Sequence, residues 1–398
     1  MYRKTYIEIN LDDLCDNIKN IVNTFNDYKY YIGVIKGNAY GHGEYISKYI
    51  TECGINYLAV SSLEEAINTR KYVDKDFPIL CLQPISLEYI DEIIKNNITI
   101  CISNIEYFNK LNEMKLKKTI KFHLKLNTGM NRLGISNIDE VNQIFDKVQG
   151  NKNIDFEGIF THLCTNGVYD NLYDKQIKKF KYLTSKIDLS KIKIVHVGRS
   201  TTLDFYDKLD ICNGCRIGIM MYGISSTFPS TNGIKNKLRN LKYENIRKKY
   251  NLPIPNSSCK TNLKQALSLK SEVIDIQKVT YADYVGYGSN TMIENDGFVA
   301  TIPVGYSDGL LTNYNNFYVY INNKKYKVIG SINMGMISAF VDESVKIGDN
   351  VTVISDKDNY KSLARNFNVT PYVLLTNLSK SLPRIYIKDN KVVKEIEV

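Results

Sequence analysis

The feature that most constrains the fold is a rhythm in the first 220 residues, where short apolar runs alternate with amphipathic segments. In segment 44–53, apolar residues recur with the spacing of one face of a helix. Runs that are apolar at nearly every position are typical of parallel strands buried on both faces. Eight such runs occur, at 31–36, 57–61, 79–83, 98–103, 122–127, 156–163, 194–198 and 215–219.

Eight strand–helix units within about 190 residues are the number that closes a (β/α)8 barrel. An open, doubly wound sheet is the alternative, but such sheets usually have fewer strands. In addition, no GxGxxG turn follows the first run. We therefore predict an α/β fold whose N-terminal part is a TIM barrel.

The pattern changes after residue 223. Segment 227–264 contains prolines, serines and a cluster of basic residues, which predicts a linker or insertion with one helix. From residue 266 onward, alternating runs separated by Gly, Asn and Asp turns predict a mainly antiparallel β domain. The predicted organisation is a strand associated with the β domain (1–10), the barrel (11–226), the basic insertion (227–264) and the C-terminal β domain (265–398).

Composition and charge narrow the possible partners. The longest apolar runs fall well short of the roughly 18–20 residues that span a bilayer, so no membrane partner is expected. The net charge is +10, but the window 231–250 holds seven basic residues against one acidic residue. The remainder is nearly balanced, so we expect no nucleic-acid partner. The N-terminus shows no apolar secretory segment, and a cytoplasmic enzyme is expected.

The eight cysteines are scattered and lie mostly within apolar stretches. In a chain without a secretion signal, we expect them to be reduced and buried. Cys212 and Cys215 have CxxC spacing, but no second pair and no nearby histidine accompany them. No metal site is therefore expected.

Active sites of TIM barrels lie at the C-terminal ends of the strands. Polar residues occur at this position on several predicted strands, namely Lys36, Lys125, His162, Ser200 and Arg216. A single lysine at a strand end is usually a surface cation, but five polar groups at one rim indicate a site. For His123 and His196, a hydrogen-bonded place in the core is the simpler interpretation.

The string KGNAYGHG at 36–43 is the most informative segment. A lysine at the end of an apolar strand is desolvated, which lowers its pKa and suits it to Schiff-base formation. The glycines permit close approach by a ligand, and Tyr40 could bind a phosphate. An ordinary glycine-rich turn explains the spacing equally well.

This string resembles the cofactor-lysine motif of the alanine racemases, fold-type III pyridoxal phosphate enzymes, whose usual form is KANAYGHG. Further segments resemble motifs of the same family and occur in the same order. They are NTGMNRLG (127–134), Thr161-His162, RIGIMMYG (216–223), VGYG (285–288) and IPVGYSDG (302–309).

The resemblance implies racemisation of L- and D-alanine by a homodimer, which supplies D-alanine for peptidoglycan. Lys36 would bind pyridoxal phosphate and act as one base, and Tyr287 would be the second base on the opposite face. Tyr287 and Met334 would come from the partner subunit. His162 and Arg216 would form a hydrogen-bonded relay that lowers the pKa of Tyr287.

The resemblance also implies a set of binding residues. Arg132 and Met334 would contact the substrate, and carbamylation of Lys125 would let it orient Arg132. Arg216 would face the pyridine nitrogen and leave it unprotonated, which favours racemisation over transamination. The implied cofactor contacts are Lys36, Tyr40, His162, Ser200, Arg216, Gly218, Ile219 and Lys380.

Several positions depart from the family pattern. Gly37, Asn127, Arg199, Gly335 and Lys380 stand where the family usually has Ala, Asp, Asn, Asp and, in some members, Tyr. These departures surround the site and bear on substrate and rate more than on reaction type. The alternatives are a serine or broader amino-acid racemase, a non-catalytic pyridoxal phosphate-binding protein, and a fold-related decarboxylase, although decarboxylases usually have an acid where this chain has Arg216. The β domain with Tyr287 argues against the second, because such binding proteins resemble the barrel alone.

Overall fold

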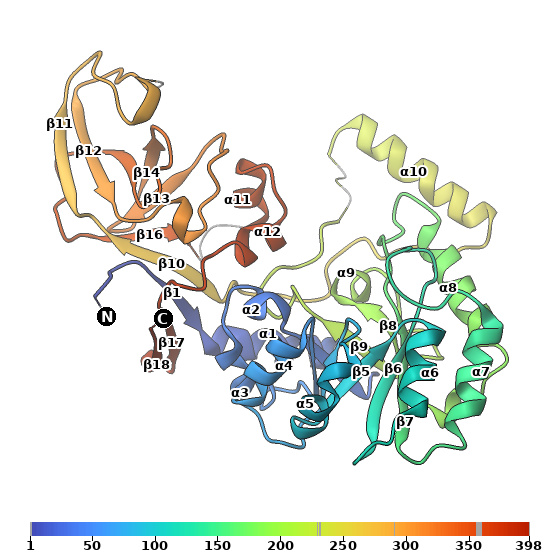
Figure 1. The fold of residues 1–398 in the computed structure, drawn as a ribbon. Coiled ribbons are helices and arrows are strands. Elements are labelled where there is room, and N and C mark those ends of the chain that lie inside the picture. Colours follow the sequence, from blue (N-terminus) through green and yellow to red (C-terminus); the bar gives the residue numbers. More distant parts are fainter. Residues whose placement is uncertain (1, 229, 231, 290, 356–359, 398) are drawn as a thin grey trace.

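The computed structural model describes residues 2–228, 230, 232–289, 291–355 and 360–397, which form a closed barrel and a separate ten-stranded sheet (Figure 1). All eight barrel strands are parallel, and β2 pairs with β9 to close the barrel. The predicted TIM barrel is therefore confirmed. Its strands are β2 (Tyr30–Val34), β3 (Tyr57–Val60), β4 (Ile79–Cys81), β5 (Ile98–Ile102), β6 (Ile120–Leu126), β7 (Ile154–Thr161), β8 (Ile194–Arg199) and β9 (Gly214–Ile217).

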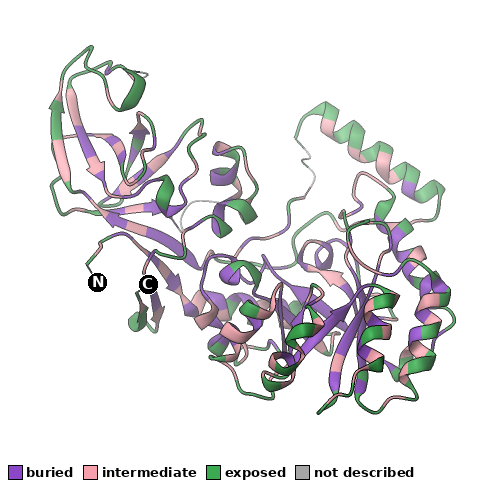
Figure 2. Ribbon diagram, in the orientation of Figure 1, coloured by how far each residue is buried: buried purple, intermediate pink, exposed green. Residues whose placement is uncertain are grey.

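Helices cover the outside of the barrel, and their sequences explain where several of them begin. Asn or Ser side chains cap α1, α4, α6 and α7 by accepting a hydrogen bond from a backbone N–H of the first turn. Each helix then buries one apolar stripe and exposes the other face, as the colours of Figure 2 show. The principal helices are α1 (Leu11–Thr24), α4 (Leu63–Arg70), α5 (Ile90–Lys95), α6 (Ile105–Glu113), α7 (Ile138–Val148) and α8 (Leu172–Leu183).

The second sheet is mainly antiparallel, as predicted. The one parallel pair named in it joins β1 and β17, near the two ends of the chain. In spatial order the strands are β11 (Asp275–Val279), β12 (Gly297–Ile302), β15 (Ile337–Val341), β14 (Lys324–Ile329), β13 (Tyr318–Ile321), β16 (Asn350–Ile354), β10 (Leu267–Glu272), β1 (Tyr6–Asn10), β17 (Arg384–Lys388) and β18 (Lys391–Ile396).

Two short helices, α11 (Tyr360–Asn366) and α12 (Pro371–Thr376), lead from the β domain back to the barrel. The ring of Tyr372 in α12 lies 6.0 Å from the ring of Tyr40 in α2 (Lys36–Tyr40). A segment close to the C-terminus therefore packs against the first barrel loop.

The basic segment contains one helix, α10 (Ile234–Lys249), which extends along the edge of the barrel (Figure 1). Buried Arg247 anchors it through two hydrogen bonds to the Asp174 carboxylate, at 2.9 and 3.0 Å. Across the described ranges, no helix has both the length and the apolar character needed to cross a bilayer.

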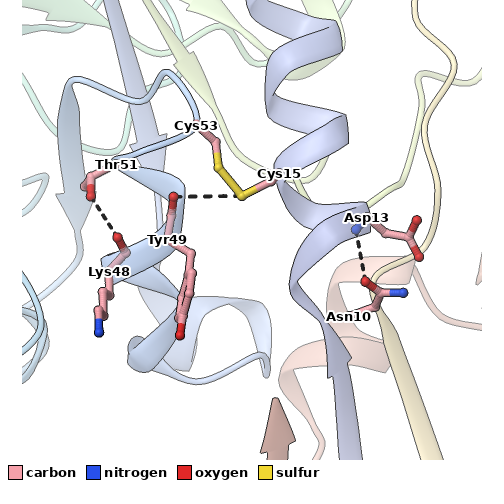
Figure 3. Close-up of a disulfide and its surroundings, with 7 residues drawn as sticks. All are labelled: Asn10, Asp13, Cys15, Lys48, Tyr49, Thr51 and Cys53. Carbon is pink, nitrogen blue, oxygen red and sulfur yellow. Dashed lines mark hydrogen bonds between the residues drawn. A yellow bond between two sulfur atoms is a disulfide. The ribbon is translucent and has the colours of Figure 1, made fainter. Parts of the chain in front are cut away.

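The expectation that all cysteines are reduced and buried is wrong. Cys15 of α1 and Cys53, in the turn after α3 (Ser47–Ile50), form a disulfide (Figure 3). Packing of α1 beside this turn brings the two Cα atoms to 5.4 Å, a separation that a disulfide spans. The spacing of the residues in sequence did not show this proximity. Of the free cysteines, Cys164 and Cys259 are exposed.

Candidate active site

A cavity of about 400 Å³ lies at the C-terminal ends of the barrel strands. Five basic side chains contribute to its wall, and no Asp or Glu does so among the described residues. It therefore carries a strong excess of positive charge and suits an anionic ligand. The basic residues are Lys36, Lys125, Arg132, Arg199 and Arg216.

The first barrel loop adopts a left-handed turn directly after β2. Asn38, Ala39 and Tyr40 have φ angles of 53°, 50° and 53°, a region that costs roughly 1–2 kcal/mol for each non-glycine residue. Packing compensates for this cost, because Ala39 is fully buried and the Tyr40 ring lies 4.8 Å from that of Tyr222. Lys36 and Tyr40, at the two ends of the turn, both line the cavity.

Lys36 is suited to act as an uncharged amine. Burial lowers its pKa, and the nearby charges of Arg132 and Arg216 lower it further. The Glu65 carboxylate opposes this, but it accepts hydrogen bonds from the N–H of Gly37 and from Ser61. An unprotonated amine is both a nucleophile and a base.

Lys125, on β6, is buried in the same wall, and its Nζ atom lies 5.5 Å from the centre of the Phe160 ring. Burial lowers its pKa; Cys101 opposes this, and the positive charge of Arg132 adds to it. Within the described part of the chain, no hydrogen bond or ion pair involves the Lys125 amine or the Arg132 guanidinium. The two predicted partners thus share the cavity without a negative charge between them.

Arg216, on β9, is fixed on the floor of the cavity by four acceptors. It donates to the carbonyl oxygens of Thr161, His196 and Val197, and its Nη1 lies 2.8 Å from His196 Nδ1. The predicted hydrogen bond between His162 and Arg216 is not among the hydrogen bonds of the described residues. His162 lines the cavity, and burial together with the charge of Arg216 lowers its pKa strongly.

A buried polar chain continues from Arg216 through the interior of the barrel. His196 Nε2 lies 2.8 Å from His123 Nδ1, and His123 Nε2 lies 3.5 Å from the Glu157 carboxylate. Burial alone would raise the pKa of Glu157, but the close approach of His123 and the hydrogen bonds from Tyr57 and Lys193 hold it well below its ordinary value. Both histidines are fully buried, so the expected core position holds for them, and His196 also supports Arg216.

Another part of the cavity wall collects neutral hydrogen-bonding groups. The N–H of Gly218 donates to Ser200 Oγ at 2.8 Å, and Ile219 and Tyr40 line the wall beside them. Tyr372 from α12 also lines this wall and was not among the residues predicted from the sequence. Lys380, which was expected to bind here, is exposed and is not part of the wall. One sequence feature could have drawn attention to Tyr372. Pro371, directly before it, is a residue typical of the first position of a helix.

Tyr287 and Met334 do not reach this cavity within one chain. Both lie on loops of the β domain, with exposed fractions of 76% and 63%. The loop of Met334 is joined to the loop of Tyr306, because the N–H groups of Tyr306 and Ser307 donate hydrogen bonds to its carbonyl oxygens. These loops carry a group of exposed large apolar residues, which we call the β-domain apolar group: Tyr281, Tyr284, Tyr287, Met292, Tyr306, Met334 and Met336.

Comparison with known proteins gives one consistent result. The family model described as the N-terminal domain of alanine racemase matches residues 9–226, and that of the C-terminal domain matches residues 266–386. An alanine racemase of Clostridium kluyveri is 32% identical over 405 residues, covering 99% of this chain and 96% of the relative. One of Halalkalibacterium halodurans is 29% identical, covering 98% and 97%.

Solved structures agree with these matches. An alanine racemase of Clostridium difficile superposes with a TM-score of 0.84 at 28% identity, covering 100% of this chain and 99% of the other. The Bacillus anthracis alanine racemase with bound L-Ala-P superposes with a TM-score of 0.83 at 28% identity, covering 100% and 98%.

Proposed function

The chain belongs to the alanine racemase family, and from that premise we propose that two copies of it form a pyridoxal phosphate-dependent racemase of alanine. The enzyme would act in the cytoplasm and supply D-alanine for peptidoglycan. The observation that carries the proposal is the cavity itself, where an amine of lowered pKa lies among cationic and phosphate-binding groups at the barrel rim.

The residues of the cavity fit pyridoxal phosphate. The excess of positive charge matches a dianionic phosphate, and Ser200, Tyr40, Tyr372 and the Gly218–Ile219 backbone offer hydrogen bonds to it. Lys36 supplies the amine for a covalent link to the aldehyde. When bound, the cofactor withdraws electrons from the substrate and so acidifies its Cα proton.

Arg216 would determine the protonation state of the ring nitrogen of the cofactor. Burial lowers the pKa of its guanidinium to about 10, which leaves it charged near neutral pH. Because a guanidinium has no acceptor atom, it would donate to the ring nitrogen of the cofactor and keep that nitrogen unprotonated. The hydrogen bonds from Arg216 to His196 and three carbonyl oxygens hold it in place for this role.

Two bases would exchange the proton at Cα. Lys36 would remove or return it on one face, and Tyr287 of a second copy would do so on the other face. The high exposure of Tyr287 and the β-domain apolar group around it support this arrangement, since exposed apolar patches mark protein contacts. In a two-fold dimer, the same surface of each chain would complete the cavity of the other.

Lys125 is the proposed site of carbamylation. Its lowered pKa favours the neutral amine that reacts with carbon dioxide, and the product would be an anion able to pair with Arg132. Arg132 would then bind the substrate carboxylate. A pocket that must distinguish alanine from serine gains little selectivity from a single added hydroxyl, so a broader substrate range is the nearest alternative.

A mixing experiment tests the shared site. Lys36→Ala and Tyr287→Phe are each expected to be inactive as homodimers. In a mixed dimer, one cavity combines the intact Lys36 of one chain with the intact Tyr287 of the other. Random re-association of equal amounts should restore about a quarter of the wild-type racemisation rate, measured with a chiral assay on L-alanine.

The control is a mixture of each variant with itself, treated in the same way. A racemisation rate of the mixed variants no higher than that of this control would contradict a shared site. A parallel assay with L-serine measures substrate preference, and absence of D-alanine from the cofactor-bound wild-type enzyme would refute the proposed activity.

A further inference from the structure

Arg199 is a half-buried cation of the cavity wall that has no ion-pair partner among the described residues. Its Nε atom is inaccessible and has no hydrogen-bond partner. In the described part of the chain, no ion pair or side-chain hydrogen bond involves its guanidinium, whereas Arg216 donates to four acceptors. A buried donor atom on a charged group normally has a partner, so the ligand of this cavity is expected to supply one for the guanidinium.

The backbone holds Arg199 firmly beside Arg216. The two residues are register partners on the neighbouring parallel strands β8 and β9, which places their side chains on the same face of the barrel wall. The N–H of Arg199 donates to Thr202 Oγ1 at 3.1 Å, and its carbonyl oxygen accepts from the same hydroxyl at 3.0 Å. Its position is therefore set by the fold and not by a flexible loop.

The neighbours of Arg199 identify the end of the cavity that it serves. Burial lowers its pKa, and the groups that act on it electrostatically are Tyr372, Cys164 and Tyr40. Ser200 follows it directly in the chain, and the N–H of Gly218 bonds to that serine. Tyr372, Tyr40, Ser200 and Gly218 are the groups that we assign to the phosphate.

Among the other cations of the wall, Arg216 is influenced by Arg199, its register partner, whereas the two lysines are not. Lys36 and Lys125 are influenced by Arg132 and Arg216, and Arg199 is not among the charges that act on either lysine. The substrate carboxylate is assigned to Arg132, which acts on both lysines. Arg199 is thus the cation associated with the phosphate-binding groups.

We propose that Arg199 pairs with the phosphate of pyridoxal phosphate, so that this chain selects the phosphorylated cofactor through a charge contact in addition to hydrogen bonds. The inference rests on the proposed cofactor. A guanidinium presents several N–H groups in a plane and suits phosphate oxygens. Nothing else on the described cavity wall can neutralise this charge, because the wall holds no carboxylate.

The test compares cofactor affinities of the full-length chain after removal of bound cofactor. Pyridoxal phosphate and pyridoxal, which lacks the phosphate, are titrated by absorbance against the wild type, Arg199→Gln and Arg199→Lys. Arg199→Gln should weaken pyridoxal phosphate binding about 10- to 100-fold, the range for a lost hydrogen bond to a charged group. Pyridoxal affinity should stay within about twofold, and Arg199→Lys should recover part of the loss. Lys235→Gln removes an exposed charge of α10 as a matched control.

A second readout follows the phosphate itself. The second pKa of a phosphate monoester is about 6, and a paired guanidinium lowers it by favouring the dianion. The ³¹P resonance of bound cofactor should therefore titrate at higher pH in Arg199→Gln than in the wild type.

The outcomes separate this inference from the proposed function. If the wild type fails to bind pyridoxal phosphate, the proposed function fails. If it binds, but Arg199→Gln weakens both ligands equally, or raises only the KM for alanine, the pairing of Arg199 with phosphate is wrong. An unchanged ³¹P titration in Arg199→Gln would also overturn it.

Discussion

Replacing Gly41 with alanine tests how closely the first barrel loop must approach the C-terminal helix α12. Gly41 has a φ of +85°, and a Cβ atom placed on it would lie 2.4 Å from the carbonyl oxygen of Leu375. The left-handed backbone costs alanine about 1–2 kcal/mol. The atom that the added Cβ would meet belongs to the backbone and cannot rotate away, so overpacking adds about 1–3 kcal/mol to the destabilisation. We expect a total destabilisation of about 2–5 kcal/mol.

Gly37→Ala is the matched control in the same turn. Its φ is +64°, but an added Cβ would lie 3.4 Å from the side-chain atom Thr376 Cγ2, which is an ordinary contact. Only the backbone cost of about 1–2 kcal/mol should remain. Since each kcal/mol shifts Tm by roughly 2–4 °C in a domain of this size, circular dichroism melting curves resolve the two variants.

The same substitution should weaken cofactor binding. Leu375 belongs to α12, which also carries Tyr372, so a shift of that helix moves a group of the phosphate-binding end. Gly41→Ala should therefore bind pyridoxal phosphate less tightly than Gly37→Ala. Equal melting temperatures and equal affinities for the two variants would refute the argument from close approach.

Four further results are expected. Tyr287→Phe should retain cofactor absorbance but lose racemisation by about 10²- to 10⁴-fold, the usual contribution of an acid–base group; a polarimetric assay measures this. Removal of dissolved carbon dioxide should slow the wild type but not Lys125→Ala, as compared in degassed and bicarbonate-containing buffers. The lowered pKa of Glu157 means that its ionised form stabilises the fold above the unfolded pKa of about 4.3 and that this stabilisation is lost as the pH falls below it. The Tm of the wild type should thus fall more steeply than that of Glu157→Gln below that pH. Denatured, unreduced protein should show six reactive thiols out of eight cysteines, because Cys15 and Cys53 are paired; eight would contradict the disulfide.

The barrel was predictable because its signal is local. Parallel strands buried on both faces must be apolar at almost every position, and each of the eight runs overlaps a strand of the structure. Strand β18 was not predictable in this way. It carries charged residues and is mostly exposed. Its pairing with β17, and not an apolar pattern in its own sequence, therefore determines its conformation.

The candidate site shows the same division. Lys36, Lys125, His162, Ser200 and Arg216 follow or lie on barrel strands, and the strand ends alone indicate that they converge. Tyr372 enters the cavity from a helix far along the chain, and Cys15 meets Cys53 through helix packing. Contacts between distant segments leave no periodic trace in a sequence.

The return of α12 to the barrel has a consequence for biosynthesis. As the chain leaves the ribosome, all eight barrel strands emerge before residue 372, and β17, the parallel neighbour of β1, emerges later still. A nascent barrel thus lacks one tyrosine of the end proposed to bind phosphate. If pyridoxal phosphate binds as proposed, its loading is expected to follow translation, after α12 has packed against the rim of the barrel.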